Sequence, residues 1–306
     1  MRVDVHQHIW TAPLLEALAV RDSLPYVRRV AGGSVLHSAG ERPYAIDAGA
    51  QAPRYRAGLV ASDGLDLALI ALSSPVGIEA LSRVEATRLI AAHLDGVRSL
   101  GEAFAAWGPV ALDRPDPDDV DELLARRCVG ISLPAGALAQ ADGPAAAIGP
   151  VLARVARRGV PLFVHPGPGT DTPRGGEAST AEPPWWLALT GYVAQMQAAW
   201  LTFVTRCRRE HPQLVALFAM LAGCAPLLSE RLAARGGPAI ELGDRRVFYD
   251  CSSYGPAAVD AVARLVGPEQ LVFGSDRPVI EPIRCGDDRR LQANAARLLA
   301  DRASTR

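Results

Sequence analysis

The first ten residues contain two histidines whose spacing suits a metal ion. The chain begins MRVDVHQHIW, in which His6 and His8 close a short apolar run. Residues two apart on a β-strand point to the same side of the sheet, so both imidazoles would face one point. Neutral imidazole nitrogens are preferred ligands of zinc and similar divalent ions. This stretch therefore predicts part of a metal site.

Two later stretches offer further ligands for the same site. The run VPLFVHPGP carries His165, and the run LVFGSDRP carries Asp276. If both runs are parallel strands of one barrel, their carboxyl ends meet His6 and His8 at one face. Three imidazoles and a carboxylate would then surround one divalent ion and leave a position for water, whose pKa the ion would lower.

Short apolar runs that alternate with longer helical patterns must position these side chains. The runs are rich in Val, Ile, Leu and Phe, as parallel strands buried on both faces are; they are Val3–His6, Leu67–Leu72, Ala103–Leu112, Val129–Leu133, Val160–His165, Leu214–Met220, Arg246–Cys251 and Leu271–Asp276. Helices are expected between them, at Glu79–Leu94, Asp118–Arg126, Ala145–Arg158, Leu189–Glu210, Leu227–Ala234 and Pro256–Val266. The pattern predicts an α/β fold, a (β/α)8 TIM barrel that forms a single domain over residues 1–306.

Two segments interrupt this alternation. Ser23–Ala61 is an insertion after the first strand with little periodicity, and Gly167–Pro184 follows the fifth strand. Loops of this length are uncommon unless they form lids or binding walls. Both leave from the carboxyl ends of strands, so we expect them to lie over the metal.

The composition narrows the function. The chain has 306 residues, a net charge of −1 and 49% hydrophobic residues, and it lacks a basic tract that would favour nucleic acid. It shows no apolar run or leader typical of a membrane protein or an exported protein, and its five scattered cysteines suit a reducing compartment, so we expect a cytoplasmic protein. All 32 basic residues are arginine, which excludes a Schiff-base lysine, a phosphate-loop lysine and a carbamylated lysine.

The order HxH, VHPGP and GSDRP resembles the amidohydrolase superfamily. Within it, the chain is most similar to amidohydrolase family 2, the branch of aminocarboxymuconate-semialdehyde decarboxylase and related hydroxybenzoate decarboxylases. The resemblance covers nearly the whole chain, including RREHPQLVALFAMLAGCAPLLSERL. It implies a barrel with one divalent metal, usually zinc, held by His6, His8, His165 and Asp276. The absence of lysine agrees, because this branch does not use the carbamate bridge.

One residue departs from the pattern of this branch. Its members usually end strand six with His–Leu–Gly–Gly, and that histidine assists proton transfer. Here the stretch is FAMLAGCAP, and the matching position is Met220. A thioether neither takes nor gives a proton, although Met220 could still line the substrate pocket.

Four other residues are candidates for substrate binding. Trp185 and Trp186 would either wall an apolar pocket or anchor their loop on the barrel. Arg277 would either bind a substrate carboxylate bidentately or form a structural ion pair. His37 lies in the insertion, which in this branch can reach over the site.

The leading functional prediction is a metal-dependent hydrolase of a small carbonyl or carboxylated compound, in which Asp276 accepts a proton from metal-activated water. The alternative is non-oxidative decarboxylation of a small carboxylic acid, which needs an acid that Met220 does not supply. A third possibility is a metal-containing binding protein without catalysis. The expected partner is a small molecule rather than nucleic acid or membrane, and a homodimer remains open.

Overall fold

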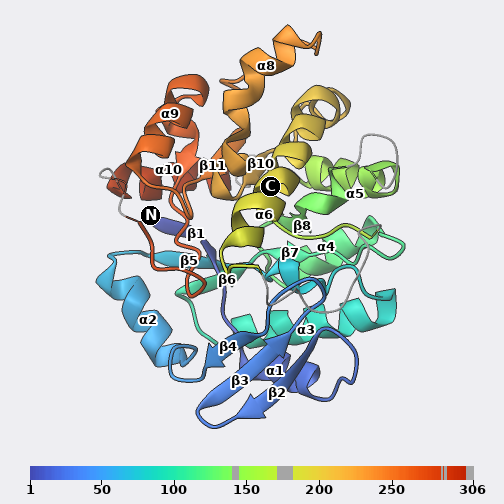
Figure 1. Cartoon of the computed structure of the whole chain (residues 1–306), viewed down its shortest axis with the longest axis vertical. Helices are drawn as coiled ribbons and strands as arrows, with labels where there is room; N and C mark the ends of the chain where they lie inside the picture. Colours follow the sequence, from blue (N-terminus) through green and yellow to red (C-terminus); the bar gives the residue numbers. More distant parts are fainter. Residues whose placement is uncertain (140–144, 171–181, 284, 286–287, 301–306) are drawn as a thin grey trace.

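The computed structural model describes residues 1–139, 145–170, 182–283, 285 and 288–300, and its centre is a ring of parallel strands (Figure 1). The strands of the ring are β1 (Val3–Gln7), β5 (Leu67–Ile70), β6 (Phe104–Ala106), β7 (Gly108–Pro109), β8 (Ile131–Pro134), β9 (Leu162–His165), β10 (Ala216–Phe218), β11 (Val247–Asp250) and β12 (Leu271–Val272). They pair in the orders β1-β5-β6 and β7-β8-β9-β10-β11-β12, all parallel.

Backbone hydrogen bonds join these two sheets into a closed barrel. Val5 N donates to Phe273 O at 2.9 Å, and Asp276 N donates to His6 O at 2.8 Å, so β1 meets the chain beyond β12. On the other side, β6 and β7 together occupy one strand position of the barrel and are interrupted at Trp107. The N–H group of Trp107 donates to Ile70 O at 3.0 Å. In the described part of the chain, eight strand positions therefore close into a ring, and the predicted (β/α)8 barrel is confirmed.

Helices surround the barrel on its outside (Figure 1). They are α1 (Ala12–Ala19), α2 (Pro53–Ser62), α3 (Arg83–Arg98), α4 (Asp118–Ala125), α5 (Ala145–Arg158), α6 (Trp186–Thr202), α7 (Arg208–Glu210), α8 (Ser229–Ala234), α9 (Pro256–Val266) and α10 (Asp288–Ala300). The predicted helix Leu189–Glu210 begins earlier, at Trp186, and is interrupted by a π-helical turn at Phe203–Cys207. None of the helices in the described ranges is both long and apolar enough to cross a bilayer.

The insertion after β1 is a small sheet followed by a helix, which corrects the expectation of little regular structure. Strands β2 (Tyr26–Val30), β3 (Gly33–His37) and β4 (Tyr44–Asp47) pair antiparallel and lie together in blue in Figure 1, ahead of α2. Val30 pairs with Gly33, so Ala31–Gly32 is a two-residue hairpin loop in which Gly32 takes φ +78°. Glycine adopts such a φ without steric cost, which favours this tight turn.

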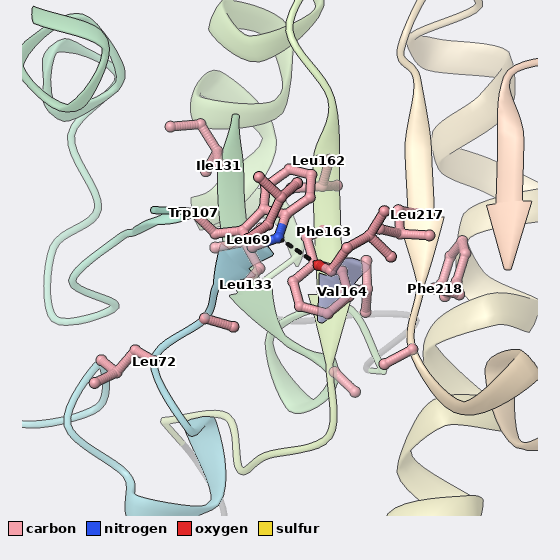
Figure 2. Close-up of a cluster of buried hydrophobic side chains, with 14 of the residues drawn as sticks. Leu69, Leu72, Trp107, Ile131, Leu133, Leu162, Phe163, Val164, Leu217 and Phe218 are labelled. Atoms are coloured by element: carbon pink, nitrogen blue, oxygen red, sulfur yellow. Dashed lines mark hydrogen bonds between the residues drawn. The ribbon is translucent and has the colours of Figure 1, made fainter. Parts of the chain in front are cut away.

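Large apolar side chains of the strands form a buried cluster that includes Trp107 and Phe163 (Figure 2). Trp107 and Phe163 stack with ring centroids 5.1 Å apart, and Trp107 Nε1 donates to Val5 O at 2.9 Å. Phe163 in turn meets the imidazole of His6 edge-on at 5.1 Å. Because interiors are packed as densely as organic crystals, this layer fixes the floor on which His6 rests.

Candidate metal centre

The side chains of His6, His8 and His165 are oriented by hydrogen bonds at their Nδ1 atoms. Each Nδ1 faces an oxygen that can only accept a hydrogen bond: Asp250 Oδ2 for His6 at 2.9 Å, Ala71 O for His8 at 2.9 Å and Pro166 O for His165 at 2.7 Å. We therefore assign the proton of each imidazole to Nδ1. Each Nε2 is left as the atom that faces the centre of the site.

The three Nε2 atoms and the Asp276 carboxylate converge. His6 Nε2 lies 3.2 Å from His8 Nε2, and Asp276 Oδ1 lies 3.5 Å from His6 Nε2 and 3.2 Å from His8 Nε2. One ligand atom from each of the four residues, His165 included, lies within 4.8 Å of the others, and all four residues are buried. Neutral imidazoles with Nδ1 protonated would turn lone pairs toward one another and toward an anion. A cation among them removes this repulsion, so the donor set fits the divalent metal that the sequence predicts.

Electrostatics in the cluster shift the pKa values of His6 and His165 in opposite directions. Burial opposes protonation of His6, but the carboxylates of Asp250 and Asp276 outweigh it and raise the pKa of His6 to about 9. Burial lowers the pKa of His165 well below its usual range, and His6 and His8 add to this effect. A divalent ion bound here would replace the proton of His6, so metal binding would release a proton below that pKa.

Buried polar contacts hold β1 in register for these histidines. Asp4 Oδ1 accepts the backbone N–H of His6 at 3.1 Å, and Asp4 Oδ2 accepts from Gln7 Nε2 at 2.7 Å. Arg56 reaches in from α2 and donates to His8 O at 2.8 Å and to Gln7 Oε1 at 2.7 Å. Burial lowers the pKa of Arg56 to about 10, yet it stays charged at neutral pH. The inserted segment therefore supports the ligand strand directly.

The turn after β10 connects Met220 to the cluster through its backbone. Met220–Cys224 has φ values between 49° and 62°, a left-handed turn that costs roughly 1–2 kcal/mol for each non-glycine residue. Gly223 packs so closely on α6 that a Cβ would lie 2.8 Å from Val193 O. Met220 N–H donates to Asp250 Oδ1 at 3.0 Å, and the other oxygen of Asp250 holds His6. Position 220 thus helps to orient a ligand whatever its side chain.

A cavity of about 610 Å³ opens over the cluster. His6, His8, His165 and Asp276 line it, and most of the remaining lining is apolar, including Trp10, Leu36, Val76, Leu187, Met220 and Val279. Its walls include residues of the inserted sheet between Leu36 and Tyr44 and residues at the start of α6. The insertion therefore lies over the four candidate ligands, as the sequence predicts. The second predicted loop lies partly outside the described residues, and Pro183 and Pro184 from its end line the cavity.

The other candidates are not among the residues that line this cavity. Trp185 and Trp186 are 55% and 43% exposed at the start of α6. His37 stacks on Tyr26 with ring centroids 4.7 Å apart. Arg277 is buried and forms ion pairs with Asp63 and Glu281 rather than facing the cavity. Of the predicted substrate-binding residues, Met220 belongs to the cavity lining.

Two polar residues of the cavity escaped the sequence reasoning. Tyr192 Oη on α6 donates to Glu41 Oε1, between β3 and β4, at 2.7 Å. Burial raises the pKa of Glu41 to about 7, although the hydrogen bond from Tyr192 lowers it. Burial and the Glu41 carboxylate raise the pKa of Tyr192. Nothing in the sequence marks them, because 151 positions separate the two and Glu41 lies in a segment without helical periodicity.

Solved structures share this fold over their full length. IDCase from Metarhizium anisopliae, in apo form, has a TM-score of 0.77 and 18% identity, covering 98% of this chain and 97% of its own. The 5-carboxyvanillate decarboxylase from Novosphingobium aromaticivorans, complexed with manganese and 4-hydroxy-3-methoxy-5-nitrobenzoic acid, has a TM-score of 0.66 and 16% identity, covering 98% and 96%. A 4-oxalomesaconate hydratase from Rhodopseudomonas palustris has a TM-score of 0.65 and 13% identity, again covering 98% and 96%.

Three further decarboxylase structures match with TM-scores of 0.66–0.67. At such identities they show a shared fold, and one fold supports several chemistries. No family model and no curated protein matches the sequence.

Proposed function

We propose that this chain is a metal-dependent member of the amidohydrolase superfamily that removes the carboxyl group of a small carboxylic acid as CO2. The observation that carries the proposal is the convergence of three Nε2 atoms and Asp276 at the base of a largely apolar cavity. The four residues would hold one divalent ion, zinc or manganese, which when bound would fix and polarise oxygen atoms of the substrate.

The walls of the cavity favour loss of CO2. A carboxylate is charged and CO2 is neutral, so a largely apolar cavity destabilises the reactant more than the product. Arg42 belongs to the lining, and its positive charge would attract a carboxylate to the cavity. The manganese-containing decarboxylase with the same fold supports this assignment over the hydrolase that the sequence favours.

Hydrolysis is the second candidate, because Asp276 also lines the cavity and could accept a proton from water. A panel assay separates the two. The metal-loaded protein is offered hydroxybenzoates, methoxyhydroxybenzoates and unsaturated dicarboxylic acids, with release of CO2 as the readout, and small esters and lactones, with release of acid as the readout. Asp276→Asn is the test variant, and Glu16→Gln, on the exposed face of α1, is its control.

We expect CO2 from at least one acid, a loss of about 10²-fold or more in Asp276→Asn and no change in Glu16→Gln. Turnover of esters or lactones alone would favour the hydrolase. If purified protein with its full metal content turned over none of these compounds, a binding protein without catalysis would replace both proposals.

A further inference from the structure

Decarboxylation consumes a proton, and Met220 does not provide one. We propose that Glu41 is the general acid of this cavity and that Tyr192 is the positioning residue that holds its carboxyl group. The two side chains come from opposite parts of the chain, the inserted sheet and α6, and both line the cavity that contains the candidate metal ligands. The inference rests on the proposed decarboxylation, because it assigns the proton that this reaction requires.

The contact between the two residues suits a proton donor. Tyr192 Oη donates to Glu41 Oε1 at 2.7 Å, so a protonated Glu41 carries its proton on the other oxygen. Burial keeps part of the Glu41 population protonated near pH 7. A group that titrates near the working pH is an efficient general acid. The titratable and charged groups that share the cavity with it are Arg42, Tyr44, Glu182, Tyr192, Asp276 and the three histidine ligands.

Glu41 alone supplies the proton that decarboxylation consumes. The bond between the carboxylate carbon and its neighbouring carbon breaks, CO2 leaves, and the electron pair stays on the carbon that remains. That carbon takes the proton of Glu41, which becomes a carboxylate and regains a proton from solvent. Protonation before the bond breaks gives the same balance.

Other residues suit this role less well. The thioether of Met220 has no proton, and Asp276 is placed to bind the ion. His37 stacks on Tyr26 and is not part of the lining. Glu182 is the competing carboxyl group of the lining and is therefore included in the test.

The experiment compares Glu41→Gln, Glu182→Gln and Tyr192→Phe with the wild-type protein, with Glu16→Gln and Tyr55→Phe as exposed controls. Metal content and circular dichroism establish that each variant is folded and loaded. CO2 release is measured from pH 5 to pH 9. Difference infrared spectroscopy over the same range follows the band of a protonated carboxyl group, which requires no substrate.

We expect Glu41→Gln to lower kcat by about 10²-fold or more and to leave metal content unchanged. Wild-type kcat should fall as pH rises through about 7. Tyr192→Phe should move this fall upward by roughly one pH unit, because the hydrogen bond from Tyr192 stabilises the carboxylate. In the infrared spectra, part of the carboxyl band lost between pH 6 and pH 8 should be absent from Glu41→Gln, and the remainder, which belongs to Glu79, should be absent from Glu79→Gln. Both controls should match the wild type.

The remaining outcomes would overturn either the role of Glu41 or the proposed decarboxylation. If Glu41→Gln keeps its activity, or if Glu182→Gln is the variant that loses it, Glu41 is not the acid, while the decarboxylase proposal stands. If the wild type releases no CO2 from any acid, the proposed function fails, and the infrared titration still tests Glu41. A Glu41 that is fully ionised at pH 5 would overturn the inference in either case.

Discussion

Replacing Asp250 by asparagine would test how the metal centre is built without touching a ligand. Asp250 Oδ2 accepts from His6 Nδ1 at 2.9 Å, and Asp250 Oδ1 accepts the backbone N–H groups of Met220 at 3.0 Å and Ser252 at 2.9 Å. In Asp250→Asn, the amide oxygen would remain on these two N–H groups. The NH2 group would then donate to His6 Nδ1, which would have to accept. The proton of His6 would therefore lie on Nε2, the atom that faces the metal position.

The expected loss follows from this change of tautomer. Residues that orient a metal-binding histidine typically contribute 10- to 100-fold in metal affinity, about 1.4–2.7 kcal/mol. Asp250→Asn also removes a carboxylate that raises the pKa of His6, and the weaker competition from the proton offsets part of this loss. Competition with a chromophoric chelator at pH 7.5 measures the Kd for zinc and for manganese, and we expect both to rise within that range.

Ser252→Ala is the matched control for this experiment. The Ser252 hydroxyl donates to Asp250 Oδ1, so its loss weakens the support of Asp250 but leaves a carboxylate facing His6. We expect its Kd to change less than about threefold, in line with one lost hydrogen bond. Equal affinities for wild type and Asp250→Asn would refute the assignment of the His6 tautomer and of the role of Asp250.

Three further predictions follow from the same structure. The double variant His6→Ala/His8→Ala should contain almost no metal by atomic emission after metal-replete expression, against about one ion per chain in the wild type; equal contents would contradict the site. Met220→His should change CO2 release by less than about tenfold, because the proposed acid is Glu41; turnover by Met220→His alone would show that the wild type lacks an acid. Burial raises the pKa of Glu79 from 4.5 to about 7, so the folded state keeps a proton that the unfolded chain releases, and stability falls by about 3 kcal/mol as pH rises through that window. In urea unfolding at pH 5 and pH 8, the free energy of unfolding of Glu79→Gln should differ less between the two pH values than that of the wild type. The same difference in both proteins would contradict the prediction.

The candidate ligands and the barrel could be predicted because their signals are local. His6 lies in β1 and His8 directly follows its end, and His165 and Asp276 each close or follow an apolar run, so the rule that parallel strands end at one face brings the four residues together. The predicted ends of the strands were less accurate. The run Leu271–Asp276 was predicted as one strand, but β12 ends at Val272 and Asp276 has φ +58°, a conformation outside the strand region that directs its carboxylate to the histidines.

The support and walls of the site could not be predicted in the same way. Arg56 and Glu41 lie in an insertion whose strands β2–β4 pair with each other rather than with the barrel. The Ala31–Gly32 loop between two short apolar runs was the available hairpin signal. Even with that hairpin assigned, the contact of Glu41 with Tyr192 depends on how the insertion packs against α6, and no spacing in one sequence carries that information.

The structure gives position 220 a role besides the proton transfer that the resemblance assigns to its side chain. The backbone of position 220 serves the metal centre through Asp250, and this contact is independent of the side chain, so methionine preserves it. The side chain at this position would have supplied the proton, and methionine removes that function while adding an apolar surface to the cavity. On the proposal that Glu41 is the acid, methionine at position 220 removes one proton donor from the cavity lining, while a buried carboxyl group elsewhere in the same lining takes over that function.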